Sequence, residues 1–314
     1  MGADTLIGAR LMQYAAASVL FGTPLFFLYG TRIPAEVKDL HRWPWERRVV
    51  LGAVLIALIG ALAWVMAETV QMSGEGADAI RPAAVWTVLS QTRFGLACLM
   101  RMVLLMLSLG ACLAITCPIL LWRIQVILGG AITLSFAWTG HGAAQIAKTA
   151  GVHLAGDLVH LLAAGIWIGA LLPLAVLAFR AGRSGASADG TALRLGLNAF
   201  SAVGVWVVAA LVLSGVVNSI FLLDLAHWRA GANSQYGKVL LAKLAVFGGM
   251  LGLAAVNRYR TSPALDDALE RRSSLGPAVH AARSALGLES LLAMLLLGAV
   301  SVLGTLAPPD SGPF

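Results

Sequence analysis

Charged residues are scarce in this chain. Among its 314 residues, 12% are Asp, Glu, Lys or Arg and 59% are hydrophobic, and the mean hydropathy is +0.84. Soluble globular domains carry about 25% charged residues. A single core surrounded by water could not bury this much apolar surface, so lipid must be the solvent for much of it. The composition therefore excludes a soluble protein and predicts a membrane protein.

Cysteines are few, and the motifs of ATP-driven transport are absent from the sequence. The three cysteines all fall in predicted apolar spans, which excludes a disulfide framework. The sequence contains neither a P-loop nor an Asp-Lys-Thr-Gly phosphorylation motif, which excludes an ATP-driven pump. No basic segment precedes the first apolar run, and this run is long enough to span a membrane, so no cleavable signal peptide is expected.

Apolar runs of membrane-spanning length occur eight times. The third and fourth form one nearly continuous run, which as a single helix would be about 67 Å long, or about twice the thickness of a bilayer. Pro118 is predicted to divide this run. We therefore expect an all-α polytopic bundle of eight transmembrane helices that forms a single domain over residues 1–314. The predicted helices cover about 8–30, 47–70, 94–117, 119–138, 152–179, 197–222, 238–256 and 284–306.

Basic residues are distributed unequally between the connecting segments. Segments 31–48, 180–196 and 257–285 together hold 13 Lys and Arg residues, whereas the segments on the opposite side hold six. The positive-inside rule therefore places both termini outside the cytoplasm, and residues 141–160 open on the same outer side. The net charge of +7 is thus interpreted as a topology signal and not as a sign of nucleic-acid binding. Segment 71–92 is predicted to hold a short interfacial helix, and 257–285 to be a solvated amphipathic loop.

The stretch from His141 to Trp167 carries the first candidate site residues. On a helix, Asp157 lies about 40° round from His153 and His160 lies about 20° to the other side, while Trp167 continues the same stripe. Two imidazoles and a carboxylate at the mouth of a membrane span must face protein or water, because lipid cannot solvate them. We therefore predict a metal site from His141, His153, Asp157 and His160. The alternative is that each histidine only bonds a backbone carbonyl or caps a helix.

The second predicted helix adds donors at the same outer mouth. Met66, Glu68 and Met72 lie near its end, and Met12 lies near the start of the first helix. Thioether sulfur suits Cu(I), imidazole suits both copper states, and a carboxylate binds Cu(II) or orients a histidine. Met66 and Glu68 therefore join the candidate metal site. Methionine in apolar helices more often serves packing, which remains the alternative for each methionine.

Seven segments then occur in a characteristic order and spacing: FGTPLFFLYG at 21–30, GHGAA at 140–144, DLVHLLAAGIWIGALLPL at 157–174, SGVVNS at 214–219, YGKVLLAKLAVF at 236–247, AVNRY at 255–259, and a closing ES…VLGTLAPP. The ordered set resembles the copper resistance protein D family of inner-membrane proteins. The resemblance implies a multi-pass protein of the bacterial inner membrane, without enzymatic activity. Such a protein would take Cu(I) or Cu(II) at its periplasmic face and transport it toward the cytoplasm, in copper homeostasis or resistance. It also implies a small periplasmic copper-binding partner of the CopC kind.

Other polar or sulfur-bearing residues are assigned to a translocation path or to structural roles. Asn257 and Glu289 are expected near the inner face, where a cation that entered at the histidines would need polar groups to leave by. Arg101 and Lys243 lie inside spans, and snorkelling toward the interface is the alternative for both. The full predicted set is Met12, Met72, Arg101, Trp167, Asn218, Tyr236, Lys243, Asn257 and Glu289.

Two other functions are open at this stage. Histidines in transmembrane helices hold haem in b-type cytochromes, so a haem-binding redox protein is one alternative, and the HLLAAGIWIG run also resembles a membrane protoporphyrinogen oxidase. A haem site, however, usually places both ligands well inside facing helices, whereas His141 and His153 lie at the lip of a span. The other alternative is a scaffold or sensor that binds copper without transporting it.

Overall fold

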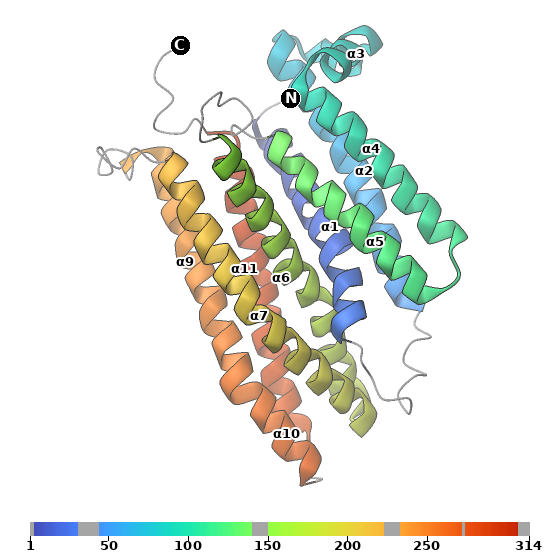
Figure 1. Cartoon of the computed structure of the whole chain (residues 1–314), viewed down its shortest axis with the longest axis vertical. Coiled ribbons are helices and arrows are strands. Elements are labelled where there is room, and N and C mark those ends of the chain that lie inside the picture. The colour runs from blue at the N-terminus through green and yellow to red at the C-terminus, as the bar shows by residue number, and fades with distance from the viewer. Residues whose placement is uncertain (1–2, 31–43, 140–149, 223–232, 272–273, 307–314) are drawn as a thin grey trace.

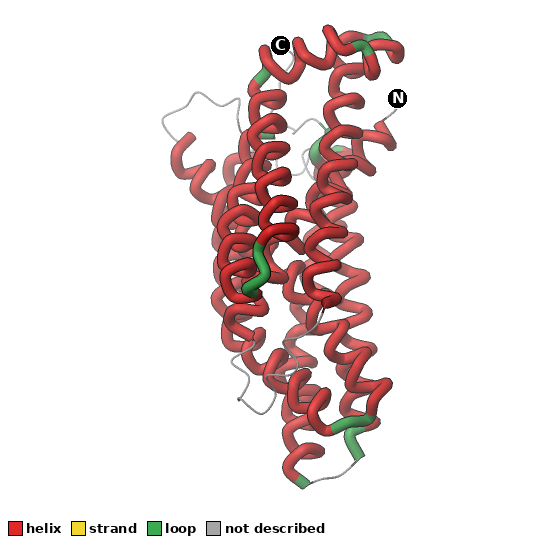
Figure 2. Tube along the Cα trace, turned by 90° about the vertical axis from the view of Figure 1, so that its right-hand side faces the viewer, coloured by secondary structure: helices red, strands yellow, loops and turns green. Residues whose placement is uncertain are grey.

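The described part of the chain is a bundle of long helices. The computed structural model describes residues 3–30, 44–139, 150–222, 233–271 and 274–306, and within these ranges it contains no strand (Figure 2). Eight of its helices are long and apolar enough to cross a membrane. This confirms the predicted all-α polytopic fold. The eight helices are α1 (Ala3–Gly30), α2 (Pro44–Ser73), α4 (Arg93–Ala114), α5 (Pro118–Leu134), α6 (Ala150–Ser184), α7 (Ser187–Leu222), α9 (Gln235–Val256) and α11 (Gly276–Leu303).

Five shorter elements complete the described chain. Near one end of the bundle lie a 3-10 turn η2 and the helix α3, and a 3-10 turn η3 follows α5. A π turn η5 continues α9 directly into the helix α10. Their bounds are η2 (Gly76–Ile80), α3 (Pro82–Gln91), η3 (Ser135–Trp138), η5 (Asn257–Thr261) and α10 (Ser262–Glu270).

The long helices alternate in direction, so α1 and α6 begin and α11 ends at the same end of the bundle (Figure 1). We call this the upper end, as it is drawn in Figure 1, and the opposite end the lower end. The N-terminal half consists of α1, α2, α4 and α5, and the C-terminal half of α6, α7, α9 and α11. Helix α1 packs against α2, α5 and α6, while α6 packs against α7, α1 and α11. The α1–α6 interface therefore joins the two halves.

Glycines allow α1 and α6 to approach closely. A Cβ atom on Gly22 would lie 2.1 Å from the Gly165 carbonyl oxygen, and one on Gly169 would lie 2.2 Å from the Ser18 carbonyl oxygen. The Thr23 hydroxyl donates a hydrogen bond of 2.6 Å to the Gly169 carbonyl. Small residues and hydroxyl bonds of this kind hold helices together in lipid, where burial of apolar surface between helices gives little driving force. This crossing fixes the position of α6 in the bundle.

The break at Pro118 is confirmed. Helix α4 ends at Ala114, and α5 begins at Pro118. Proline is favoured at the start of a helix, because the backbone N–H groups of the first turn have no partner within the helix and the missing N–H therefore costs no hydrogen bond. Arg47 of α2 donates to the Ile115 carbonyl in the short connection. Cys117 is exposed in this connection, so the prediction that all three cysteines lie within spans is wrong for Cys117.

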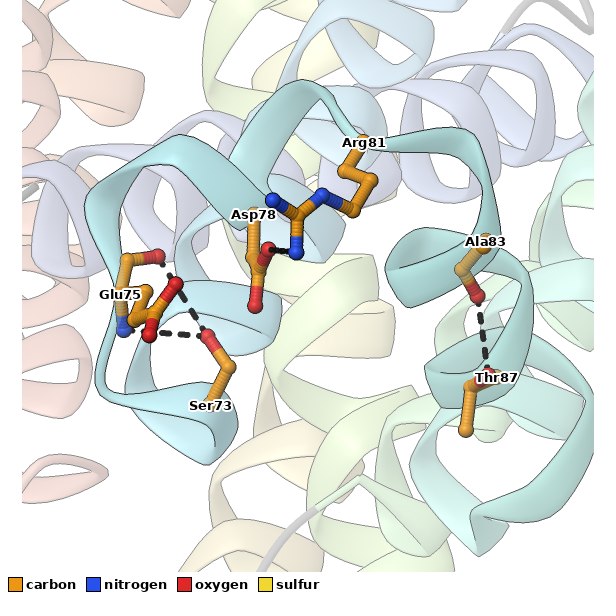
Figure 3. Close-up of polar contacts among 6 residues, drawn as sticks. All are labelled: Ser73, Glu75, Asp78, Arg81, Ala83 and Thr87. Atoms are coloured by element: carbon orange, nitrogen blue, oxygen red, sulfur yellow. Dashed lines mark hydrogen bonds and ion pairs between the residues drawn. The ribbon is translucent and has the colours of Figure 1, made fainter.

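Segment 71–92 contains the predicted short helix, α3. Helix α2 ends before Gly74, whose φ of +77° suits a residue without a side chain. In η2, Asp78 forms an ion pair of 2.8 Å with Arg81, and α3 follows at Pro82 (Figure 3). Trp86 of α3 is exposed, as expected for a side chain at a membrane interface.

The two segments predicted as loops at the lower end are mostly helical. Helix α6 continues to Ser184, and α7 begins at Ser187 after a turn at Gly185. Segment 257–285, predicted as a solvated amphipathic connection, is largely helical and contains η5, α10 and the first turns of α11. The charged residues of these segments mark where water begins, but Arg and Glu are good helix formers, so the helices run on past the membrane.

Candidate functional site

Asp157 and His160, near the start of α6, face helix α7. His153 is buried, and its Nε2 atom lies 3.8 Å from Oδ2 of Asp157, one turn further along α6. The other carboxylate oxygen of Asp157 accepts a hydrogen bond of 2.7 Å from Nδ2 of Asn218 on α7. Asp157 therefore joins the predicted histidine stripe to a neighbouring helix. With His160 and Ser214, these residues form what we call the upper polar cluster.

His160 is oriented by a hydroxyl of α7. Its Nδ1 atom lies 3.0 Å from Oγ of Ser214, and that hydroxyl donates its own proton to the Ala210 carbonyl at 2.5 Å. Because a hydroxyl has a single proton, Ser214 must accept from the Nδ1–H of His160. The neutral imidazole then carries no proton on Nε2. His160 thus presents a free nitrogen lone pair, the form in which histidine binds a metal ion.

Helix α9 contributes to the electrostatics of the same cluster. The half-buried Lys243 lies within electrostatic range of both Asp157 and His160, and Tyr236 lies within range of Asp157. The structure therefore brings Asn218 into contact with the predicted histidine stripe, and it brings Tyr236 and Lys243 within electrostatic range of it. The positive charge of Lys243 partly balances the Asp157 carboxylate.

A second group of polar side chains lies halfway along the bundle. The Trp167 indole Nε1–H donates a hydrogen bond of 2.8 Å to Oε1 of Glu289, and Nδ2 of Asn257 donates one of 3.2 Å to Oε2. All three side chains are buried, with exposed fractions of 2%, 1% and 6% for Trp167, Glu289 and Asn257. We call this group the central polar cluster. It joins α6, α11 and the first residue of η5, a π turn, and π turns often occur at functional sites.

Glu289 lies further from the start of its helix than the predicted helix bounds imply. Asn257 and Glu289 were predicted near the inner face, at the ends of their spans. Because α11 begins at Gly276, eight residues earlier than predicted, Glu289 lies at the middle of this helix. It is about 20 Å from the start of α11, at 1.5 Å per residue.

Helix α6 connects the two clusters. His153, His160 and Trp167 follow one another at intervals of seven residues, which keeps them on the same side of the helix. The distance along the axis from His153 to Trp167 is about 21 Å. Trp167 is packed edge-on against Phe200 of α7 and Phe247 of α9, at ring centroid distances of 6.4 and 6.2 Å. The two clusters therefore lie on one side of α6 inside the C-terminal half, about 10 Å apart along the helix axis from His160 to Trp167.

The structure does not bring all the predicted metal ligands together. Met66 and Glu68 lie on α2, which packs against α1, α3 and α4, whereas α6 packs against α1, α5, α7 and α11. Helix α1 thus separates them from the histidines of α6 (Figure 1). His141 lies outside the described residues. Within the described ranges, no group of three or more His, Cys, Asp and Glu side chains lies close enough to hold a metal ion.

The remaining sulfur-bearing candidates lie at the upper end of the N-terminal half. Met12 is half-buried on α1, where it faces Gly60 of α2, and Met72 is exposed at the end of α2. Glu68 is half-buried and lies within electrostatic range of Cys98 on α4. These residues form a second region of possible donors, apart from the upper polar cluster.

Arg101 has a structural environment that the sequence did not reveal. It is fully buried, so it does not snorkel. Its Nε donates to Oγ of Ser135 at 2.8 Å, and its guanidinium lies 4.0 Å from the Phe136 ring centre and 5.5 Å from that of Trp64. Arg10 lies over the same Trp64 ring at 5.2 Å. Cation–π contacts of this kind stabilise a buried guanidinium, and they favour the structural role for Arg101.

Two residues that matter for this geometry were missed by the sequence analysis. Ser214 orients His160 but was not selected, although it opens the family-like segment SGVVNS. Arg10 was counted only as a loop charge on the outer side, yet it is buried between α1 and α2. A polar residue within a family-like segment was an available signal for Ser214. No local signal identified Arg10, because its burial depends on the distant Trp64.

Family models and known proteins match most of this chain. A family model described as "Copper resistance protein D-like, N-terminal domain" matches residues 1–152, and one described as "Copper resistance protein D" matches residues 194–303. Copper resistance protein D of Pseudomonas syringae pv. tomato is 34% identical over 307 residues, which cover 96% of each chain. Inner membrane protein YebZ of Escherichia coli is 28% identical over 84% of this chain and 86% of its own.

A more distant relative is longer. Copper transport protein CutJ of Bacillus subtilis is 25% identical over 97% of this chain but only 53% of its own length. No solved structure matches. Copper resistance protein D of Pseudomonas syringae matches 96% of this chain at 34% identity, and eight helices of the described residues are able to span a membrane. This chain belongs to the copper resistance protein D family and is a multi-pass protein of the inner membrane.

Proposed function

We propose that this protein binds copper ions at the upper end of the bundle and carries them along α6 toward the lower end. The observation that carries the proposal is the pair of polar clusters on one side of α6, one with His153 and His160 and one with Trp167 and the buried Glu289. Polar groups inside a membrane are costly and mark ion pathways. The relatives named copper resistance and copper transport proteins support a role in copper resistance or transport.

The upper polar cluster is the proposed copper site. Nε2 of His160 supplies a lone pair, and His153 with Asp157 supplies a second imidazole and a carboxylate. Imidazole binds both copper states, and a carboxylate favours Cu(II) or orients a histidine. His141, which precedes α6 in the sequence, belongs to the proposed site as well. Met66 and Glu68 are proposed as two individual donors near the upper end, because residues two apart on a helix point about 200° away from each other.

The position of Lys243 suits a site that holds its ion only briefly. Its positive charge lies within range of both Asp157 and His160, and it therefore weakens the attraction of the cluster for a cation. Conduction requires binding that is strong enough to admit an ion and weak enough to release it. A membrane potential that is negative inside favours inward movement by about 2.3 kcal/mol per charge per 100 mV. We therefore propose transport driven by this potential or by affinity differences.

We further propose that the upper end faces the periplasm and receives copper from a small copper-binding protein of the CopC kind. The described helix ends next to the three segments rich in Lys and Arg lie at the lower end, namely the end of α1, the start of α2, the turn between α6 and α7, and α10, and the positive-inside rule assigns this end to the cytoplasm. Alkaline phosphatase fused after the carboxyl terminus or within 71–92 is therefore expected to be active. The same reporter within 257–285 is expected to be inactive. Activity only in the last fusion would reverse the proposed orientation.

The transport proposal is tested by separating binding from uptake. Glu289→Ala is expected to leave copper bound to the purified protein but to lower cellular copper accumulation, because Glu289 lies beyond the upper polar cluster on the path. Glu46→Ala is the matched control, since Glu46 is also buried but lies near the start of α2 in the other half. Cellular copper is measured by mass spectrometry at equal expression. Unchanged accumulation in the Glu289 variant would instead favour a sensor or scaffold.

A further inference from the structure

Glu289 is a buried carboxyl group without a cationic partner among the described residues. Its side chain is 1% exposed in the middle of a membrane-spanning helix. Its two hydrogen-bond partners, Trp167 and Asn257, are both neutral. A buried carboxylate that lacks an opposite charge pays a desolvation cost that two neutral hydrogen bonds do not offset. Such a group avoids this cost by holding a proton.

The charged side chains on the elements packed against α11 are engaged elsewhere. On η5, Arg258 donates to the Ser201 carbonyl at 2.7 Å, and Arg260 is exposed. On α9, Lys243 lies within range of Asp157, and on α1, Arg10 lies over Trp64. The tyrosines Tyr14, Tyr29, Tyr236 and Tyr259 on these elements supply no positive charge, and the other acidic, basic and histidine side chains on them and on α11 itself lie toward the ends of the bundle or in the upper polar cluster. They are Asp4, His153, His160, Arg180, Arg183, Lys238, Asp266, Asp267, Glu270, His280 and Arg283.

The Asn257 amide is suited to both protonation states of Glu289. As placed, its Nδ2 donates to Oε2 of Glu289, while its buried Oδ1 has no hydrogen-bond partner. A half-turn of the amide exchanges the positions of Nδ2 and Oδ1 with little change in shape. Oδ1 would then accept a hydrogen bond from a protonated Glu289, while Trp167 continues to donate to the other oxygen. The cluster can therefore satisfy the neutral acid as well as the carboxylate.

We propose that Glu289 is a proton-binding site that exchanges its proton for the positive charge of a copper ion passing along α6. This inference rests on the proposed function. With no ion in the path, the carboxyl group holds the proton. When an ion arrives from the upper polar cluster, the O–H bond of Glu289 breaks and the proton leaves to water. The carboxylate then balances the charge of the ion within the low-dielectric interior. Each ion that passes therefore displaces one proton.

Infrared spectroscopy of the purified protein in lipid tests the proton site without any copper. The wild type is expected to show the carbonyl stretch of a protonated carboxylic acid, and Glu289→Gln is expected to lose it. Glu270→Gln is the matched control, since Glu270 is exposed at the end of α10 and its loss should leave the band unchanged. Asn257→Leu retains Glu289 but removes its hydrogen-bond partner, and it should shift the band. Absence of any band that Glu289→Gln removes, or that Asn257→Leu shifts, would overturn the inference.

Copper addition then tests the exchange. In liposomes that hold the wild type, uptake of copper is expected to diminish the Glu289 band and to release protons, detected by a pH-sensitive dye in weak buffer. Glu289→Gln should lose the proton release. Copper uptake that leaves the band and the dye unchanged would overturn the exchange while the transport proposal stands. If the wild type takes up no copper, the transport proposal fails and the exchange with it, and the infrared band still reports whether Glu289 holds a proton.

Discussion

Gly169→Val is expected to prevent the bundle from assembling. A Cβ atom at this position would lie 2.2 Å from the Ser18 carbonyl oxygen and 2.6 Å from the Cα atom of Gly22. Both obstacles are backbone atoms of α1, so no side chain can move aside. Overpacking a dense core costs about 1–3 kcal/mol and sometimes more, and a backbone clash belongs to the upper part of that range. Because α1 and α6 join the two halves, the loss should affect the whole protein.

The measurement is the yield of monodisperse protein in detergent and its melting temperature. Gly204→Val is the matched control, because a Cβ atom on Gly204 of α7 would meet nothing within 4 Å. Its effect on the free energy of unfolding should stay within about 0.5 kcal/mol. A Gly169 variant that purifies and melts like the wild type would contradict the close crossing of α1 and α6.

His160→Ala is expected to lower copper affinity at least tenfold, which corresponds to about 1.4 kcal/mol or more. The variant removes an imidazole whose Nε2 is free because Ser214 fixes the proton on Nδ1. A copper ion in a protein is bound by only a few soft or borderline donor atoms, so the loss of one of them lowers the copper affinity strongly. Affinity is measured by competition with a chelator of known copper affinity, on purified protein of unchanged melting temperature.

Two companion variants separate a ligand from a residue that only orients one. Loss of an outer partner typically costs about 10–100-fold in metal affinity. Asp157→Asn and Ser214→Ala should both fall within that range, and His160→Ala should be much worse than either. His280→Ala is the control, because His280 is exposed in the first turns of α11, at the lower end. Equal losses for His160→Ala and Asp157→Asn would remove His160 from the ligand set.

The membrane helices were predictable because their composition is a strong local signal. Eight spans follow from eight apolar runs, and the break at Pro118 follows from the length of a run that no bilayer could accommodate as one helix. The stripe of His153, Asp157 and His160 also followed from helical periodicity, and the structure places Asp157 and His160 at the interface with α7. Helical periodicity predicts on which face of a helix a residue lies, and the position of the residue in the sequence predicts how far along the helix it lies.

What periodicity cannot give is the helix that lies opposite. The bond from Trp167 to Glu289 joins residues 122 positions apart, and neither residue carries a local sign of the other. For the same reason Met66 and Glu68 were grouped with the histidines by depth alone, although α1 lies between them. The helix ends at the lower end of the bundle were predicted too early, because basic residues mark the edge of the membrane and not the end of a helix.

The most direct test of the central claim is metal analysis of the purified wild-type protein together with its visible spectrum. The proposal predicts bound copper in stoichiometric amount and no Soret band. Among the histidines of the described helices, His153 and His160 both lie on α6, and His280 is exposed in the first turns of α11, whereas a haem held by two histidines usually takes them from facing helices. A Soret band that His160→Ala abolishes, or a wild-type protein that binds no copper, would contradict the account.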